Sequence, residues 1–317
     1  MLPTPDDLHE ARDRIRGLAR RTPLIRLDAP DAPAEIWLKL ECLQPIGSFK
    51  IRGAANAMGQ IAAADLARGV VTASAGNMAQ GVAWCASARR IPCTVIAPDT
   101  APAAKLSAIE RLGARIIQVP FDRWWQTFQE RRYPGVAGTF IHAFDDPRVM
   151  AGNGTIGLEI LEDLPDAESV VIPWGGGGLA CGIGAAMRAN SPSCGLFAAE
   201  AETGAPLAAA LAAGQPVPVD YRPSFVDGIG SRQVFPQMLE RARTLLDGSI
   251  VVSLAGVASA VRILAERAHV VAEGAGACAL AAAMSGRAGK GKVVCVVSGG
   301  NIDLDLYAGL LAGKQTA

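Results

Sequence analysis

Short apolar runs alternate along this chain of 317 residues with longer segments that are rich in alanine. Each run has four or five residues, many of them β-branched, which is typical of buried strands. Strands that alternate with helices predict parallel sheets flanked by helices, an α/β fold. The expected strands are Val70–Ala73, Cys93–Ala97, Arg115–Val119, Ser169–Pro173, Leu196–Ala199, Ile250–Ser253 and Val293–Val297.

The first 61 residues show the same two patterns. Leu8 and Ile15 belong to a helical spacing of apolar residues that predicts a helix over Thr4–Arg20. Ile36–Glu41 predicts a strand, and Arg52–Ile61 predicts a helix. The residues between the latter two therefore form a strand-to-helix turn.

Lys50 stands in this turn, at the end of a Gly-Ser-Phe-Lys sequence. Gly47 allows close backbone approach, and Phe49 can shield the amine of Lys50 from water. Desolvation lowers the pKa of an amine and makes it a nucleophile able to form a Schiff base. On these four residues alone, an ordinary surface lysine after a turn is the stronger interpretation.

Composition narrows the class of protein. Half of the residues are hydrophobic and 19% are charged, so the chain predicts a compact globular protein with a sizeable core. Thirty basic and thirty acidic residues give no net charge. Nucleic acid and anionic membrane surfaces are therefore poor candidates for partners, and a small molecule is the better one.

Cysteine usage and the N-terminal segment bear on the compartment. The seven cysteines are odd in number, show no C-x-x-C spacing and fall mostly in apolar runs, so we expect reduced core residues. Acidic residues near the N-terminus interrupt any secretory h-region, and no apolar stretch reaches membrane-spanning length. These features predict a cytoplasmic protein. The cysteines are Cys42, Cys85, Cys93, Cys181, Cys194, Cys278 and Cys295.

Ser74–Gly81 follows a predicted strand and opens an alanine-rich helix. A helix N-terminus offers free N–H groups to an anion, and Ser74 and Asn77 add side-chain donors. The segment can therefore hold a carboxylate. An ordinary helix cap would use the same residues.

Four consecutive glycines, Gly175 to Gly178, lie between another strand and another helix. Successive backbone N–H groups of such a turn can face a phosphate. Gly175, Gly177 and Ala180 also fit a dinucleotide fingerprint, with Glu200 about 20 residues on, so an NAD-dependent oxidoreductase is a rival interpretation. Two further matches lower the specificity of that fingerprint. They are Gly152, Gly154 and Gly157, and Gly274, Gly276 and Ala279.

Two more glycine-containing segments, Glu273–Ala277 and Ser298–Asn301, complete the candidate chemistry. Ser298 follows a very apolar strand, and ligands in open parallel sheets bind at the carboxyl ends of strands. A neutral hydroxyl there can bond a ring nitrogen without protonating it. A turn-forming Ser-Gly pair is the alternative.

In this order, the motifs resemble those of the fold type II family of pyridoxal-phosphate enzymes, in its threonine/serine dehydratase and serine racemase branch. The resemblance covers nearly the whole chain, and an ordered set of motifs is far more specific than any single one. It favours pyridoxal 5'-phosphate over NAD. The segments that carry it are Gln44–Ala54, Ser74–Asn77, Phe144–Pro147, Gly154–Ile156, Gly175–Gly178, Asp227–Ile229, Glu273–Gly276 and Ser298–Asn301.

The resemblance implies a role for each site residue. Lys50 would hold the cofactor as a Schiff base, with Phe49 against the pyridine ring. Asn77 would bond the ring hydroxyl, and Ser298 would bond the pyridine nitrogen. The backbone of Gly175, Gly176, Gly177, Gly178 and Leu179 would wrap the phosphate. The amino acid substrate would lie against Ser74, Ala75, Gly76, Asn77 and Met78.

The family fold implies two domains, each with a mainly parallel twisted sheet flanked by helices, as in the β subunit of tryptophan synthase. Carried over to this chain, residues 1–59 and 147–317 form the large cofactor-binding domain, and residues 60–146 form the small domain. The usual family state implies a homodimer.

The implied reaction is β-elimination of water from a β-hydroxy amino acid, giving a 2-oxo acid and ammonia. Lys50, released by the substrate amine, is placed to take the α-proton. Because Ser298 is neutral, quick loss of a β-leaving group is favoured over transamination. An amino acid racemase or β-replacement enzyme on the same cofactor remains an alternative, and an NAD-dependent oxidoreductase is a second one.

Three departures from the family pattern bear on the substrate and on metal binding. Met78 replaces a usual histidine and Ile46 a usual threonine, which makes the site more apolar and opens it to a bulkier substrate such as phenylserine. Glu200 matches one carboxylate of the family's cation site, but Gly204 and Pro206 follow where other ligands are expected. One carboxylate does not predict a tight Mg²⁺ site.

Overall fold

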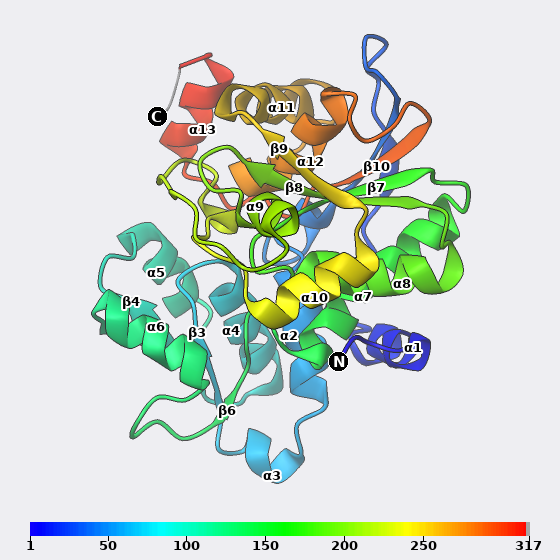
Figure 1. The fold of residues 1–317 in the computed structure, drawn as a ribbon. Coiled ribbons are helices and arrows are strands. Elements are labelled where there is room, and N and C mark those ends of the chain that lie inside the picture. The colour runs from blue at the N-terminus through cyan, green and yellow to red at the C-terminus, as the bar shows by residue number, and fades with distance from the viewer. Residues whose placement is uncertain (315–317) are drawn as a thin grey trace.

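The structure, a computed structural model, describes residues 1–314 and contains two sheets flanked by helices (Figure 1). The strands are β1 (Leu24–Arg26), β2 (Glu35–Lys39), β3 (Val70–Ala73), β4 (Cys93–Pro98), β5 (Arg115–Val119), β6 (Thr139–Phe140), β7 (Ser169–Pro173), β8 (Gly195–Ala201), β9 (Gly248–Val252) and β10 (Lys292–Val296). The helices are α1 (Pro5–Arg14), α2 (Lys50–Gly59), α3 (Ala63–Leu66), α4 (Asn77–Arg89), α5 (Ala103–Glu110), α6 (Phe121–Glu130), α7 (Pro147–Asp163), α8 (Gly178–Asn190), α9 (Pro206–Ala213), α10 (Pro236–Leu245), α11 (Leu254–Arg267), α12 (Gly274–Met284) and α13 (Leu304–Leu311), with short 3-10 helices η1 (Glu41–Leu43) and η2 (Asp227–Ile229).

The larger sheet has the strand order β1-β2-β10-β7-β8-β9. Only β1 and β2 pair in antiparallel fashion, and the other neighbours are parallel. Alternate residues of β10 face opposite layers, as the period of two in a strand requires. Val293 and Cys295 pack in the core with α11 and α12, whereas Val294 and Val296 pack in the core with α8 and α10.

The smaller sheet has the order β5-β4-β3-β6, and all of its strand pairs are parallel. Val70 and Val95 pack on α2 and α4, while Val71 and Ile96 face Phe128 of α6 on the other side. All four strands lie within residues 70–140. We therefore propose residues 60–146 as the small domain and residues 1–59 with 147–317 as the large one, of which residues 315–317 lie outside the described part.

Glycines allow α7 to pack closely on its neighbours. A Cβ added to Gly152 would lie 2.4 Å from the carbonyl oxygen of Arg52, and one added to Gly154 would lie 2.7 Å from that of Gly182. The fingerprint-like spacing of Gly152, Gly154 and Gly157 therefore lies inside a helix, where it serves helix packing.

The alternation of strands and helices is as the sequence predicts, and the differences lie at the edges. The first helix was expected to reach Arg20 but ends at Arg14, because Ile15 caps it and Gly17 adopts φ +82°. The short edge strands β1 and β6 were not predicted. In residues 1–314, no helix is both long enough and apolar enough to cross a membrane.

Candidate functional site

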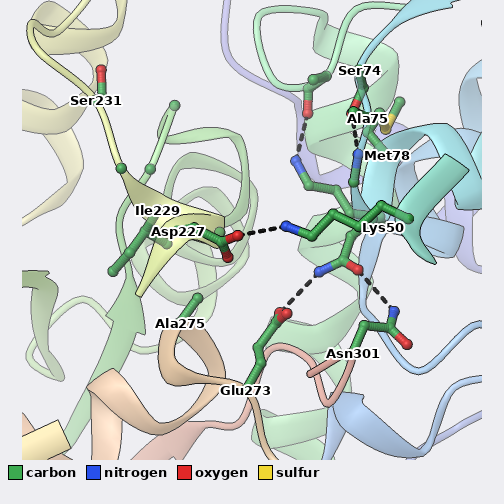
Figure 2. Close-up of a pocket in the computed structure, with 18 of the residues that line it drawn as sticks. Lys50, Ser74, Ala75, Met78, Asp227, Ile229, Ser231, Glu273, Ala275 and Asn301 are labelled. Atoms are coloured by element: carbon green, nitrogen blue, oxygen red, sulfur yellow. Dashed lines mark hydrogen bonds and ion pairs between the residues drawn. The ribbon is translucent and has the colours of Figure 1, made fainter. Parts of the chain in front are cut away.

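A cavity of about 1200 Å³ collects residues from both sheets. Ser74, Ala75 and Met78 line one side of it, and Glu273 and Asn301 line another (Figure 2). Every residue that the sequence predicts for the cofactor or the substrate lines this cavity. These residues are Phe49, Lys50, Ser74, Ala75, Gly76, Asn77, Met78, Gly175, Gly176, Gly177, Gly178, Leu179 and Ser298.

Lys50 is the first residue of α2, directly after the loop that leaves β2 and η1. Its Nζ donates a hydrogen bond to the carbonyl oxygen of Ala143 at 2.9 Å and lies 5.0 Å from the centre of the Phe49 ring. Burial lowers the pKa of Lys50 to about 8, although the Glu273 carboxylate opposes this shift. The amine can therefore become neutral, and nucleophilic, near neutral pH.

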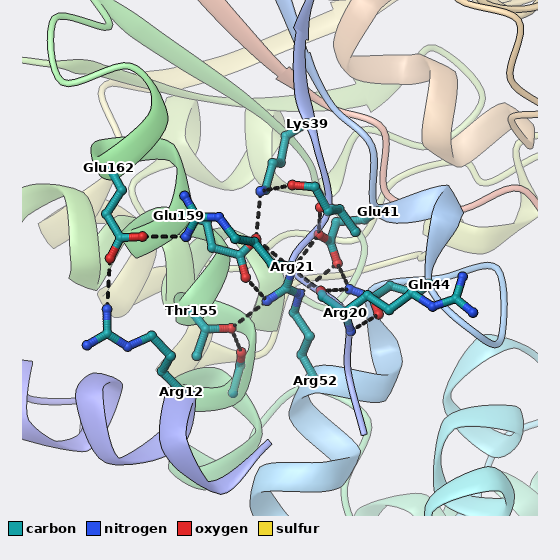
Figure 3. A network of polar contacts seen from close by, with 12 residues as sticks. Arg12, Arg20, Arg21, Lys39, Glu41, Gln44, Arg52, Thr155, Glu159 and Glu162 are labelled. Carbon is teal, nitrogen blue, oxygen red and sulfur yellow. Dashed lines mark hydrogen bonds and ion pairs between the residues drawn. The ribbon is translucent and has the colours of Figure 1, made fainter. Parts of the chain in front are cut away.

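A buried network of charges fixes the first turn of α2 (Figure 3). Arg52, 1% exposed, donates from Nε to Glu41 at 2.8 Å and from Nη1 to Glu159 of α7 at 2.6 Å. Lys39 of β2 also donates to Glu159, at 2.6 Å. Two buried cations thus face two buried carboxylates. Arg52 ties α2 directly to η1 and α7, and Glu159 links it onward to Lys39 of β2.

The end of β10 meets the loop before Lys50. The backbone N–H of Phe49 donates to the carbonyl oxygen of Ser298 at 3.0 Å, and that of Gly300 donates to Gly47 at 2.9 Å. These contacts bring Ser298, which is 4% exposed, to the same cavity as Lys50.

Asn77, the first residue of α4, is held from two sides. Its Nδ2 donates to Glu273 at 2.9 Å, and its Oδ1 accepts from Asn301 at 2.8 Å. Burial raises the pKa of Glu273 to about 7. The sequence singled out the segments of Glu273 and Asn301 but assigned neither residue a role, since nothing local links them to Asn77.

The tetraglycine turn is shaped so that side chains would not fit. Gly177 has φ +89°, and a Cβ on Gly176 would lie 2.0 Å from the ring of Phe144. Helix α8 begins at Gly178, so its first N–H groups have no partner within the helix. Such a cradle fits a phosphate. With Lys50 in the same cavity, the residues fit pyridoxal phosphate.

An aromatic wall, which sequence reasoning missed, continues the cavity beside Lys50. Phe144 follows the residue whose carbonyl Lys50 bonds, and its ring centre lies 5.5 Å from that of Phe128 and 5.3 Å from that of Phe235. Trp125 extends this group, 6.0 Å from Phe235. The wall comprises Trp124, Trp125, Phe128, Phe144 and Phe235, all of which line the cavity.

Met78 and Ile46 were expected to make the site more apolar, and the structure places them differently. Met78 lines the cavity but is 2% exposed and packs in the same core as Ile46. Ile46 faces that core and contributes its carbonyl oxygen as an acceptor for Asn301 at 2.8 Å. Of the two side chains, Met78 is the one on the described lining of the cavity.

Glu200, the one carboxylate considered for a metal, is engaged elsewhere. It accepts from the N–H groups of Leu207 and Ala208 at 2.8 Å each, and from Ser249 at 2.6 Å. It therefore holds the N-terminus of α9. No group of three or more His, Cys, Asp or Glu side chains within residues 1–314 could hold a metal ion.

Comparisons with known proteins agree on one family. A family model described as pyridoxal-phosphate dependent enzyme matches residues 15–299. The L-threonine ammonia-lyase of Thermotoga maritima is 40% identical over 311 residues, covering 96% of this chain and 77% of that protein. The catabolic L-threonine dehydratase of Staphylococcus aureus strain N315 is 37% identical, covering 96% of this chain and 91% of that protein.

Solved structures show the same fold. Maize serine racemase has a TM-score of 0.89 and 30% identity, covering 99% of this chain and 98% of that one. A threonine deaminase from T.th. has a TM-score of 0.88 and 30% identity, covering 95% of this chain and 99% of that one. These are fold type II enzymes, so the predicted fold class is confirmed.

Proposed function

Because this chain belongs to the family of pyridoxal-phosphate-dependent enzymes, we propose that it is a lyase that eliminates water from a β-hydroxy amino acid. The products would be a 2-oxo acid and ammonia. The observation that carries the proposal is Lys50, a partly buried amine with its pKa lowered to about 8, in the same cavity as the tetraglycine cradle. Relatives named threonine ammonia-lyases and dehydratases support the reaction class.

In the proposed site, the N–H groups of the tetraglycine turn and of the first turn of α8 hold the cofactor phosphate, and Lys50 carries the covalent link. When bound, pyridoxal phosphate acidifies the α-hydrogen of an attached amino acid. The N-terminus of α4, with Ser74, binds the substrate carboxylate. These contacts fix the α-carbon next to Lys50.

Lys50 then acts as the base. Once its amine is released, a pKa near 8 leaves a sizeable neutral fraction at physiological pH, and that fraction can accept the α-proton. Ser298 offers a neutral hydroxyl to the ring nitrogen. A hydroxyl does not fully protonate that nitrogen, which favours prompt departure of the β-hydroxyl.

The test is Lys50→Ala, with loss of the lysine-linked visible absorbance and of 2-oxo acid formation as readouts. One side chain supplies both anchor and base, so we expect activity to fall below detection while the protein stays folded. Lys292→Ala is the matched control, because Lys292 pairs with Asp166 on the surface. Near-normal turnover by Lys50→Ala would refute the proposal.

We further propose that the substrate carries a bulky apolar group on its β-carbon, as phenylserine does. The aromatic wall supports this, since Phe144 lies beside the partner of Lys50 and the wall extends from there. An apolar pocket discriminates by only about 1–3 kcal/mol per methylene-sized change, so bulk is favoured gradually. Met78 contributes one more apolar surface.

Specificity constants test this preference. We expect kcat/KM for phenylserine to equal or exceed that for L-threonine, and L-threo-3-hydroxyaspartate to be poor because the aromatic wall offers no cation to its second carboxylate. Phe235→Ala should lower the phenylserine-to-threonine ratio about 2- to 10-fold, the worth of one aromatic contact. Leu311→Ala, at a 39% exposed residue of α13 that does not line the cavity, is the control. A strong threonine preference, unchanged in Met78→His and Phe235→Ala, would contradict the proposal.

The serine racemase neighbour keeps racemisation as a second candidate activity. Ala75 has no hydroxyl with which to deliver a proton, and we therefore place racemisation behind elimination. The family match gives the NAD alternative no support.

A homodimer and a cytoplasmic location complete the proposal. The reducing compartment is supported by the cysteines, since all seven are buried and free of disulfides. Light scattering of the purified protein tests the dimer, and a monomeric mass with full activity would contradict it.

A further inference from the structure

The carboxamide of Asn77 has a donor end and an acceptor end of nearly the same shape. Which end faces its neighbours decides what the residue can offer to a bound molecule. Asn77 opens α4 and lines the cavity, so this polarity bears directly on the site.

The orientation of the Asn77 carboxamide is set by a backbone group outside the site, the carbonyl oxygen of Ile46, through Asn301. The carbonyl oxygen of Ile46 can only accept, and Asn301 lies 2.8 Å from it, so the atom of Asn301 that faces it is the donor Nδ2. The same Nδ2 lies 2.8 Å from Asn77. Both hydrogens of Asn301 are thereby used, and the end of Asn77 that meets it is the acceptor Oδ1.

The other end of Asn77 is consequently Nδ2, which lies 2.9 Å from a carboxylate oxygen of Glu273. One of its two hydrogens is used there. Among residues 1–314 the second hydrogen has no hydrogen-bond partner, and Asn77 borders the cavity. That hydrogen is the donor that Asn77 presents to a ligand.

We propose that Asn301 and Glu273 are positioning residues that lock the Asn77 carboxamide with its donor available to an anionic oxygen of the bound cofactor. The inference rests on the proposed function, in which Asn77 bonds the oxygen substituent of the cofactor ring. If the Asn77 carboxamide were turned round, its Oδ1 would face the Glu273 carboxylate and its Nδ2 would face Nδ2 of Asn301. Both existing hydrogen bonds would then be lost.

Two glycines make room for the positioning residues. A Cβ on Gly47, which has φ +69°, would lie 2.9 Å from Oδ1 of Asn301. A Cβ on Gly299 would lie 2.3 Å from Oε1 of Glu273. Glu273 is only 8% exposed, so water competes little with Asn77 for it.

A double-mutant cycle on the holoenzyme tests the proposal, with the dissociation constant of pyridoxal phosphate and the absorbance of the bound cofactor as readouts. In the unmodified protein, Asn301→Ala should weaken cofactor binding about tenfold and shift the absorbance, as expected for one charge-assisted hydrogen bond. In the Asn77→Ala background, the same change should have less than about a twofold effect, because Asn301 acts through Asn77.

Asn190→Ala is the matched control, because Asn190, the last residue of α8, lies outside the cavity and donates from Nδ2 to the carbonyl oxygen of Ala186 at 2.9 Å. It should leave both readouts unchanged. Equal effects of Asn301→Ala in the two backgrounds would overturn the inference while leaving the lyase proposal intact. Unchanged binding and absorbance in Asn77→Ala alone would remove the role of Asn77 and the inference with it, whereas Lys50→Ala tests the lyase separately.

A second pair of variants covers the case in which Asn301→Ala does not fold. Glu273→Gln keeps an oxygen that accepts from Asn77, so it should hold cofactor affinity within about threefold. Glu273→Leu removes the acceptor and should cost about tenfold, again only when Asn77 is present. Equal losses in Glu273→Gln and Glu273→Leu would refute the positioning role.

Discussion

Replacing Arg52 with methionine should destabilise the protein strongly, because it leaves two buried carboxylates with one cation between them. Arg52 bonds both Glu41 and Glu159, and only Glu159 keeps a charged partner, Lys39. Removing one member of a buried ion pair costs about 3–5 kcal/mol. We expect the lower end, since Glu41 retains hydrogen bonds from Thr22 at 2.6 Å and Gln44 at 3.1 Å.

The lost free energy of unfolding can be expressed as a decrease in melting temperature. Unfolding entropy is about 2.1 cal/mol/K per residue, so for 317 residues it is about 0.7 kcal/mol/K. A loss at the lower end, about 3 kcal/mol, should then lower Tm by about 4–5 °C. Differential scanning fluorimetry of the two proteins at one scan rate measures the difference. Arg52→Met should also attach the cofactor more slowly than the unmodified protein, since Arg52 fixes the turn that carries Lys50.

Arg68→Met serves as the control for Arg52→Met, and the double variant Arg52→Met with Glu41→Gln serves as the rescue. Arg68 pairs with Asp65 at 2.6 Å on the surface, where such pairs contribute about 0–1 kcal/mol, so Arg68→Met should lower Tm by less than about 2 °C. Adding Glu41→Gln to Arg52→Met removes the unpaired charge and should recover part of the loss. If Arg52→Met melted within about 2 °C of the unmodified protein, the network would not stabilise α2 as we argue.

Three further predictions concern the chemistry. Ser298→Asp should protonate the ring nitrogen and slow elimination, seen as a long-wavelength absorbance on mixing with substrate; unchanged spectra and rates would show that Ser298 does not touch the ring. Ala75→Ser should gain measurable racemisation while the unmodified protein shows almost none, and inversion without the substitution, followed by chiral chromatography, would contradict this. Attachment of pyridoxal phosphate to cofactor-free protein should quicken about tenfold per pH unit below pH 8 and level off above it, because the Lys50 ammonium, with its pKa lowered to about 8 by burial, must lose a proton first. Stopped-flow absorbance measures that profile, and a rate still rising above about pH 10 would indicate an ordinary surface lysine.

The sequence by itself determined the alternation of elements. Val293–Val297 and Ser169–Pro173 are apolar at nearly every position because central parallel strands are buried on both faces, and this signal is local. The turn that carries Lys50 and the glycine turn before α8 were equally visible, since φ near +89° at Gly177 requires glycine. The resemblance to a family then predicted that both turns contact the same cofactor.

Only the tertiary structure decided which side chains meet. Asn77 contacts Glu273 and Asn301, which lie about 200 residues away, and no spacing along the chain encodes that contact. The same applies to the aromatic wall, and to Ile46, whose carbonyl oxygen accepts from the distant Asn301. Periodicity records only which face of an element is buried. The packing of helices on the two sheets selects the partners on that face, and partners chosen in this way leave no local pattern in the sequence.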